Sequence, residues 1–507
     1  MFSHFRAAPG SIAALTSLSV EAELRRQRAG GKKLRRTPGS PFKLDSKSMG
    51  TFALFHPSPW LIRCTEPLAA FGGTWKDYVE AVRKQLRSKL IDHFHLQVVT
   101  KTPKGRKLWQ LLAGLERLEG DSDAVRRAWL DLPRRNPSRD ADSKAKAQEL
   151  SRSAASTLAR WQNGAEVPQS ISQRELRELA VFALEAPGIV AGRALRRHRR
   201  KLLENELGAL VSLCWQGLAS YLGDPTFRVV SGKPGQTHQL VRNWVREGCL
   251  ESVLDEHLVA TGGNSGDGKD SPLELLRQAL QMHAGSFSFY PAGPGQEPKS
   301  FRVRCHAAVP FGGNDPEVGT NAPKVSRSDV LRIAFNSPFR PYLLATTSVG
   351  QQGLDFHPWC RIIAHWDLCS SPVDLEQREG RIQRYLGLAG RRSLAKKYGQ
   401  TALADMPQSL IAMSPWHHIF NSAEEAASDS DGLSPWWVTP GAAVQCHLFT
   451  MPLSRDRARY EKLRRQRTLY RLALGQPNQE DFIATLEQAS PARQKELAEL
   501  TLRLRPR

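Results

Sequence analysis

Hydrophobic residues recur at helical spacing through most of residues 75–260, and only a polar stretch rich in Pro and Arg near 133–146 interrupts the pattern. This periodicity predicts a mostly helical segment. The longest uncharged run, residues 207–223, contains Ser212, Gln216 and Ser220. It falls short of the roughly 20 apolar residues that span a bilayer. We therefore expect a buried core helix there, and no membrane span.

The pattern changes after residue 300. Compact apolar runs at 301–308, 342–347 and 361–368 are typical of strands, and residues 328–335 have helical spacing. At the N-terminus, residues 2–5 resemble the end of a strand, and a Pro-Gly turn at Pro9 and Gly10 precedes a short helix. Alternation of strands and helices predicts a parallel sheet with crossover helices.

The charge balance favours a polyanionic partner. The 72 Lys and Arg outnumber the 50 Asp and Glu, which gives a formal net charge of +22. Basic residues cluster at 25–36, 193–201 and 455–471. Each cluster is either a solvated surface or a phosphate contact. The seven cysteines are odd in number and form no CxxC pair, which argues against a zinc site or a disulfide framework. The cysteine pattern therefore favours a reducing cytoplasm as the compartment. The weak apolar stretch at 12–20 has no basic leader before it and is a poor signal peptide.

Two short segments imitate ATP-binding motifs. Residues 263–270, GNSGDGKD, nearly fit the phosphate-loop pattern, but Asp270 stands where a Ser or Thr must hold magnesium. The trio Asp255, Glu256 and His257 resembles a magnesium-binding acidic signature. It lies in a predicted helix, however, and not at the end of a strand. We interpret the first segment as a linker and expect neither to bind ATP.

One segment whose residues could bind a ligand is 342–356, YLLATTSVGQQGLDF. A predicted strand ends in hydroxyl residues, and a turn containing Gly353 leads to Asp355. Ligands gather at the carboxyl ends of parallel strands. Hydroxyl and backbone N–H groups there can hold a phosphate, and glycine permits close approach. Many α/β proteins end a strand in this way, so the segment alone is a moderate signal.

A second segment, residues 371–387, reads SPVDLEQREGRIQRYLG. Ser371 can cap a helix that begins at Pro372. At 100° per residue, Gln377, Arg381 and Arg384 share one face of the predicted helix, opposite its apolar side chains. Guanidinium groups match phosphate oxygens and suit the charge of a transferring phosphoryl group. The alternative is an exposed helix with a ladder of ion pairs.

Together these segments resemble motifs V and VI of superfamily 2 helicases, with the pattern ATTSxGxxGLDF followed by QRxGRxxR. The likeness is closest to bacterial Swi/Snf-type DEAD/DEAH-box helicases. It extends through residues 336–339 upstream and Arg391 and Arg392 downstream. The opening FSHFRAAPGSIAALTS resembles the motif IV region, and residues 454–457 and 475–482 resemble the C-terminal extension.

The resemblance implies roles for individual residues. Thr347 and Ser348 would contact a nucleic-acid phosphate, while Gly353 and Asp355 would border the nucleotide. Many relatives have Asp at the place of Ser348. The residues that would face the ATP phosphates are Gln377 and the two arginine fingers, Arg381 and Arg384.

The resemblance also implies a missing partner. Relatives carry a first RecA-like lobe with a phosphate loop and a magnesium-binding acidic pair, whereas this chain begins at about motif IV. ATP and magnesium would be bound mainly by that lobe, supplied by a separate or upstream polypeptide.

We therefore expect an α/β fold: a RecA-like parallel sheet with a large helical insertion and a helical C-terminal extension. The expected division is 1–22 (motif IV), 23–299 (insertion), 300–400 (core of the second lobe) and 401–507 (extension). The expected function is the C-terminal motor lobe of an ATP-dependent helicase or translocase acting on nucleic acid, which we expect to be DNA. The alternative is a non-catalytic nucleic-acid-binding or adaptor protein that retains the lobe.

Overall fold

The computed structural model describes residues 1–3, 8–29, 42–100, 106–135, 141–164, 166–223, 237–261, 271–280, 285–289, 301–305, 307–311, 327–347, 355–404 and 413–427, most of 435–472 and short pieces of 478–496. The described chain is mostly helical. Its strands form short pairs, of which β1–β2, β5–β6 and β7–β8 are parallel and β3–β4 is antiparallel. The expectation of parallel strands beside a large helical part is confirmed to this extent.

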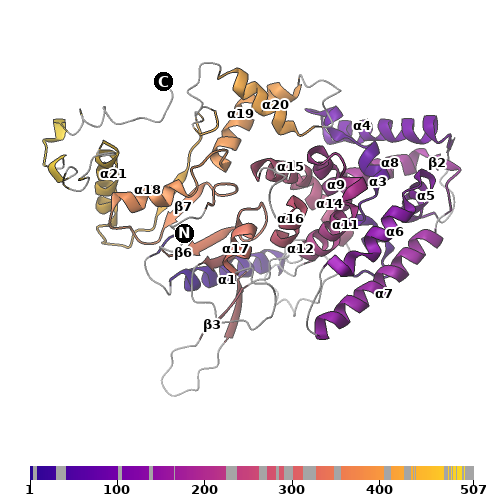
Figure 1. The fold of residues 1–507 in the computed structure, drawn as a ribbon, viewed down its shortest axis with the longest axis horizontal. Coiled ribbons are helices and arrows are strands. Elements are labelled where there is room, and N and C mark those ends of the chain that lie inside the picture. The colour runs from indigo at the N-terminus through magenta and orange to yellow at the C-terminus, as the bar shows by residue number, and fades with distance from the viewer. Residues whose placement is uncertain are drawn as a thin grey trace.

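The helical part occupies residues 49–280 and lies on the right in Figure 1. One short parallel pair, β1 (Gln97–Val99) and β2 (Ser170–Ser172), lies within it. Its helices are α2 (Met49–Phe55), α3 (Pro59–Cys64), η1 (Pro67–Ala70), α4 (Trp75–Arg87), η2 (Ser88–His93), α5 (Leu108–Glu119), α6 (Ser122–Leu130), η3 (Leu132–Arg135), α7 (Ala141–Asn163), α8 (Gln173–Glu185), α9 (Pro187–His198), α10 (Leu202–Asn205), α11 (Leu207–Ser212), η4 (Leu213–Ala219), α12 (Ser220–Leu222), α14 (Thr237–Glu247), α15 (Leu250–Ala260) and α16 (Pro272–Leu280).

Local sequence explains where several of these helices begin. Ser172 caps α8, and its partner Glu175 accepts a hydrogen bond from the Ser172 backbone, which completes a capping box. Pro187 occupies the first turn of α9, where its missing N–H costs nothing. Residues 207–222 form the consecutive helices α11, η4 and α12 with mostly buried side chains, so the predicted core helix is confirmed.

A polar network lies at the centre of the helical core. His56 and Glu116 are both buried, and His56 Nε2 lies 2.6 Å from Glu116 Oε2. Trp129 donates its indole N–H to His56 Nδ1 over 3.0 Å, and Trp161 donates to Glu116 Oε1 over 3.3 Å. Because Nδ1 accepts, the imidazole proton must reside on Nε2 and point at the carboxylate. Each buried polar group in this network therefore has a partner.

The parallel strands of the second part are β5 (Ala308–Phe311), β6 (Leu343–Thr346), β7 (Ile362–His365) and β8 (Gln445–Leu448). Phe2 makes parallel bridges to both Thr346 and His365. Its N–H donates to Ala364 O over 3.0 Å. The chain start thus joins the pairs β5–β6 and β7–β8 into one row, with residues 1–3 in the middle. In this register, five residues lie side by side across the row, and we call them the level of Phe2: Phe311, Thr346, Phe2, His365 and Leu448.

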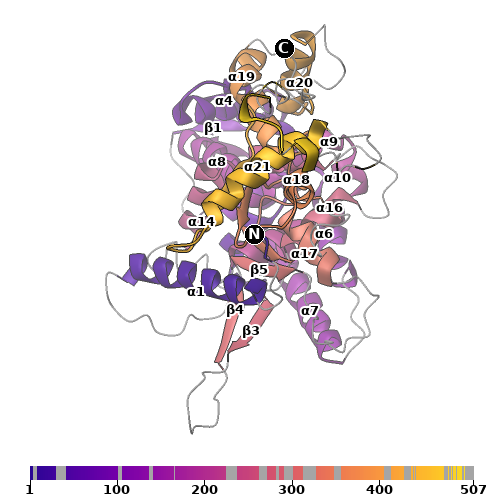
Figure 2. The same cartoon turned by 90° about the vertical axis from the view of Figure 1, so that its left-hand side faces the viewer.

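The remaining elements surround this row or project from it. A β-hairpin, β3 (Gly285–Phe289) with β4 (Phe301–Cys305), extends away at the bottom of Figure 1. Helix α1 (Ala8–Ala29) packs along β5, where the Ser17 hydroxyl donates to Ala308 O and accepts from Ala308 N. The other helices are α17 (Arg327–Phe335), α18 (Pro372–Gly380), α19 (Leu388–Ala404), α20 (Pro415–Glu425) and α21 (Asp456–Leu472). Figure 2 shows α21 crossing the face beside α18.

Two sequence-based predictions about these elements were wrong. Pro9 and Gly10 form no turn but lie in the first turn of α1, where proline is tolerated. Strand β8 lies within residues 401–507, which were predicted to form a helical extension and for which no strand was predicted. The predicted strand at 342–347 and the predicted helix at 328–335 are confirmed as β6 and α17. Among the described residues, no helix combines the length and apolar character that a membrane crossing requires.

Candidate functional site

The turn after β6 meets the end of α18 through two contacts. The backbone N–H of Phe356 donates to Arg381 O over 2.9 Å. Arg384 Nε lies 2.9 Å from Asp355 Oδ1, and it also donates to Gly380 O over 3.1 Å. The structure therefore brings together Asp355, Arg381 and Arg384, which sequence reasoning had placed in two separate segments.

The predicted helical face that carries both arginines is wrong in detail. Helix α18 ends at Gly380, Arg381 occupies the C-cap, and Arg384 lies in the following turn. Glycine is a poor helix former, and Leu386 adopts a positive φ of 49° that no helix accommodates. Gln383 N still donates to Glu379 O over 3.1 Å, but the segment after α18 also takes main-chain partners from elsewhere: Phe356 N donates to Arg381 O, and Leu388 N donates to His357 O. Gln377 is exposed on α18 itself.

Electrostatics at this turn favour an anion. Burial, then the neighbouring Arg384, lowers the pKa of Arg381, while Asp355 opposes that shift. Burial is also the largest cause that lowers the pKa of His357 next to Asp355. Arg384 thus pairs with Asp355, whose charge also acts on Arg381. Both polar side-chain contacts of Arg384 to described residues use Nε. The terminal N–H groups of a guanidinium can donate to phosphate oxygens.

The strand ends present a different set of groups. One residue beyond the level of Phe2 lie Thr347, Ser3, Trp366 and Phe449, in that order across the row. Thr347 is 9% exposed, so most of its surface is covered. The Ser3 hydroxyl donates to Asp367 Oδ2 over 2.6 Å. Ser348 and Gly353, the other predicted contacts of this turn, lie outside the described residues.

Arg378 is a buried residue of this region that sequence reasoning missed. Its guanidinium lies 5.3 Å from the centre of the Phe2 ring, and Nη1 donates to Asp367 O over 3.2 Å. Nη1 also lies 3.3 Å from His365 Nδ1. The signal was its spacing three residues after the buried Leu375, which puts it on the packed face of α18.

The basic C-terminal helix also contributes. Arg471 lies 2.6 Å from Glu376, and Arg467 pairs with Glu379. Leu463 is buried against α18. Part of the charge of α21 therefore holds the helix that carries Arg381, while its remaining arginines face solvent.

Other predicted features are structural. Asp255, Glu256 and His257 lie on α15, as expected, and Glu256 pairs with Arg391 over 2.9 Å. Within the basic cluster at 193–201, Arg193 and Arg197 are buried in ion pairs with Glu251. This part of the cluster is not a phosphate-binding surface. The segment 263–270 lies outside the described residues.

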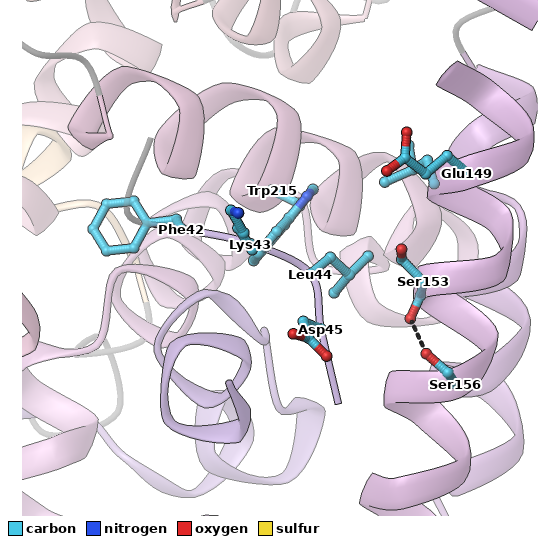
Figure 3. A pocket seen from close by; sticks show the side chains of 9 residues that line it. Phe42, Lys43, Leu44, Asp45, Glu149, Ser153, Ser156 and Trp215 are labelled. Atoms are coloured by element: carbon cyan, nitrogen blue, oxygen red, sulfur yellow. Dashed lines mark hydrogen bonds between the residues drawn. The ribbon is translucent and has the colours of Figure 1, made fainter. Parts of the chain in front are cut away.

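A cavity of about 520 Å³ opens in the helical part, between the chain before α2 and helix α7 (Figure 3). Lys43 and Asp45 line it from the chain before α2, and Glu149 lines it from α7. This mixed lining defines no ligand. Among the residues that the structure describes, no group of three or more His, Cys, Asp or Glu is placed to hold a metal. No family model, curated protein or solved structure matches this chain.

Proposed function

We propose that this chain is the second, RecA-like motor lobe of an ATP-dependent helicase or translocase that acts on nucleic acid, with DNA as the preferred polymer. The convergence of Asp355, Arg381 and Arg384 beside a row of parallel strands supports this proposal most directly. The resemblance to helicase motifs V and VI is the reason for proposing ATP hydrolysis as the reaction. The surplus of 22 positive charges is consistent with a phosphate polymer as the partner.

Arg381 and Arg384 are the proposed arginine fingers. A guanidinium stays protonated at every physiological pH and can bind two oxygens at once. The main-chain bond from Phe356 fixes the turn that carries both side chains, so little reorganisation is needed when phosphate arrives. Bound ATP, held with magnesium by a first lobe, would supply the phosphoryl group. Asp355 would lie beside the bound nucleotide and keep the Arg384 side chain oriented through their ion pair.

The test is the nucleic-acid-stimulated ATPase of the full chain, mixed with a first lobe that carries a phosphate loop and an acidic pair. Arg381→Ala or Arg384→Ala should lower kcat by about 10³-fold or more, because each removes charge stabilisation in the transition state. The matched control is Arg392→Ala, an exposed arginine on α19. Circular dichroism should show that all three variants keep their helix content.

An unchanged kcat in both finger variants would refute this assignment. If nucleic acid still bound in a salt-sensitive manner that ATP did not alter, the chain would be a non-catalytic binding or adaptor protein. A loss of kcat in Arg392→Ala as large as in the finger variants would also contradict the assignment, because it would indicate a general effect of positive charge.

A further inference from the structure

Two aromatic rings stand exposed at the carboxyl ends of β7 and β8. Trp366 is 44% exposed and Phe449 is 47% exposed, and their ring centroids lie 5.6 Å apart. Phe449 is fixed by its backbone N–H, which donates to His365 O over 3.1 Å. Trp366 is fixed in the same way by a 3.0 Å bond to Phe2 O. We call this pair the aromatic platform.

The platform lies on the same level as the predicted phosphate contact. Thr347, Ser3, Trp366 and Phe449 each follow the level of Phe2 by one residue on adjacent parallel strands. Neighbouring strands are about 4.8 Å apart, so the backbone of Trp366 is about 10 Å from that of Thr347. The carboxylate of Asp367, the residue after Trp366, accepts a hydrogen bond from the Ser3 hydroxyl.

Apolar exposure continues beyond the rings. Met451 is 73% exposed, and Leu453 is fully exposed. Exposed apolar side chains that lie close together often mark a binding surface. Trp366 follows β7, and Phe449, Met451 and Leu453 follow β8, so these four residues come after the two strands at one edge of the strand row.

Positive charge follows immediately along the chain. Helix α21 begins at Asp456, and most of its basic side chains are exposed. The exposed ones at and near its start are Arg455, Arg457, Arg459, Lys462, Arg464 and Arg465. Nearby acidic groups are few: Glu461 lies 3.6 Å from Arg464, and Asp456 is half-buried at the helix start. Exposed aromatic rings followed so closely in the chain by a basic helix match a ligand with flat apolar faces and a phosphate backbone.

We infer that the aromatic platform stacks the bases of single-stranded nucleic acid, whose phosphates run along the exposed arginines of α21. A duplex keeps its bases stacked on each other and cannot offer them to Trp366 and Phe449. The platform therefore selects the single strand. This inference deepens the proposed function, on which it rests, by naming the form of the polymer.

The experiment measures binding of the full chain to fluorescein-labelled oligonucleotides of about 20 nucleotides, by anisotropy. The probes are oligo-dT and a blunt duplex of the same length. We expect wild type to bind oligo-dT more tightly than the duplex. Trp366→Ala and Phe449→Ala should each weaken oligo-dT binding about ten-fold and leave duplex binding unchanged. Trp366→Phe, which keeps a ring, should restore most of the affinity.

The matched control is Trp75→Ala, a tryptophan of similar exposure on α4 in the helical part. Unchanged oligo-dT binding in both platform variants would overturn the inference and leave the proposed function standing. Failure of wild type to bind either probe would overturn both. Light scattering is measured in parallel, because a dimer that Trp366→Ala dissociates would show that the rings bind a second copy instead, which also overturns the inference.

Discussion

Arg384 and Asp355 form an ion pair, with Nε and Oδ1 2.9 Å apart, between two segments that the chain brings together from either side of β7. The side chains are 38% and 46% exposed. Coulomb attraction is weak at such exposure, because water screens it and the long arginine side chain loses conformational entropy. The pair therefore serves to orient a guanidinium, and its contribution to stability is small.

We expect Arg384→Ala and Asp355→Ala each to change the free energy of unfolding by less than about 1 kcal/mol. Urea titration of the two variants and of the double variant gives the coupling energy, expected near 0.5 kcal/mol. The same Arg384→Ala protein should lose its ATPase activity in the two-lobe assay. A coupling above about 2 kcal/mol would contradict this view and mark the pair as part of the packed core.

Arg378, which lies on α18 before the turn that carries Arg384, should behave in the opposite way. It is completely buried and contacts the ring of Phe2, the central residue of the strand row. Arg378→Ala leaves a cavity there and removes the donor to Asp367 O, so we expect a loss of about 3 kcal/mol or more in unfolding free energy. Urea titration measures it.

Gln377→Ala is the control for that substitution, since Gln377 is the exposed neighbour on α18. It should alter the free energy of unfolding by no more than about 0.5 kcal/mol. Equal effects of the two substitutions would show that Arg378 does not support the strand row.

Short apolar runs located some of these elements from sequence alone. Residues 343–346 form a compact apolar run that ends in threonine, and 327–335 have clear helical spacing. Strand β8 lacked such a signal, because its sequence QCHL is half polar and its side chains alternate between exposed and half-buried. An edge strand of this kind owes its conformation to pairing with β7, which sequence periodicity does not report.

The candidate site was only partly accessible to the same reasoning. Counting 100° per residue placed Arg381 and Arg384 on one face of a helix, but α18 ends at Gly380. Their meeting with Asp355 depends on a main-chain bond between Phe356 and Arg381, which are distant in sequence. Such nonlocal bonds arise from tertiary packing and overrule helix periodicity.

Two of the ion pairs between α18 and α21 should differ in strength; Arg467 Nε also lies 3.6 Å from Glu376 Oε2. Arg467 and Glu379 are mostly buried, with 19% and 15% exposed, whereas Arg471 and Glu376 are 43% and 35% exposed. We expect Arg467→Ala to cost about 2 kcal/mol of unfolding free energy, because it leaves a carboxylate without its partner in a poorly hydrated place. Arg471→Ala should cost less than about 1 kcal/mol.

Urea titration of both variants at low and high salt checks this contrast. Salt should reduce the effect of Arg471→Ala, because exposed pairs are screened, and leave that of Arg467→Ala nearly unchanged. If Arg471→Ala proved the more destabilising of the two, this result would contradict the packing of α21 against α18.

His257 should make the stability of the protein depend on pH. Burial, with a further contribution from Arg391, lowers the pKa of His257 to about 4. Trp359 donates its indole N–H to His257 Nδ1 over 3.0 Å, a bond that only the neutral imidazole accepts. In the unfolded chain the pKa is near 6.5.

Between these two pKa values the unfolded state binds more protons than the folded one, so acid favours unfolding. Stability from this group is complete above pH 6.5 and falls by up to about 1.4 kcal/mol per pH unit as the pH drops towards 4. His257→Asn keeps an acceptor for Trp359 and does not titrate, so urea midpoints between pH 7 and 5 should depend less steeply on pH. The slope will not vanish, because the pKa of His365 is also lowered to about 4.

The control is His93→Asn, at an exposed position, which should leave the slope as it is in wild type. An equally steep slope in His257→Asn would mean that His257 takes up its proton without loss of the fold.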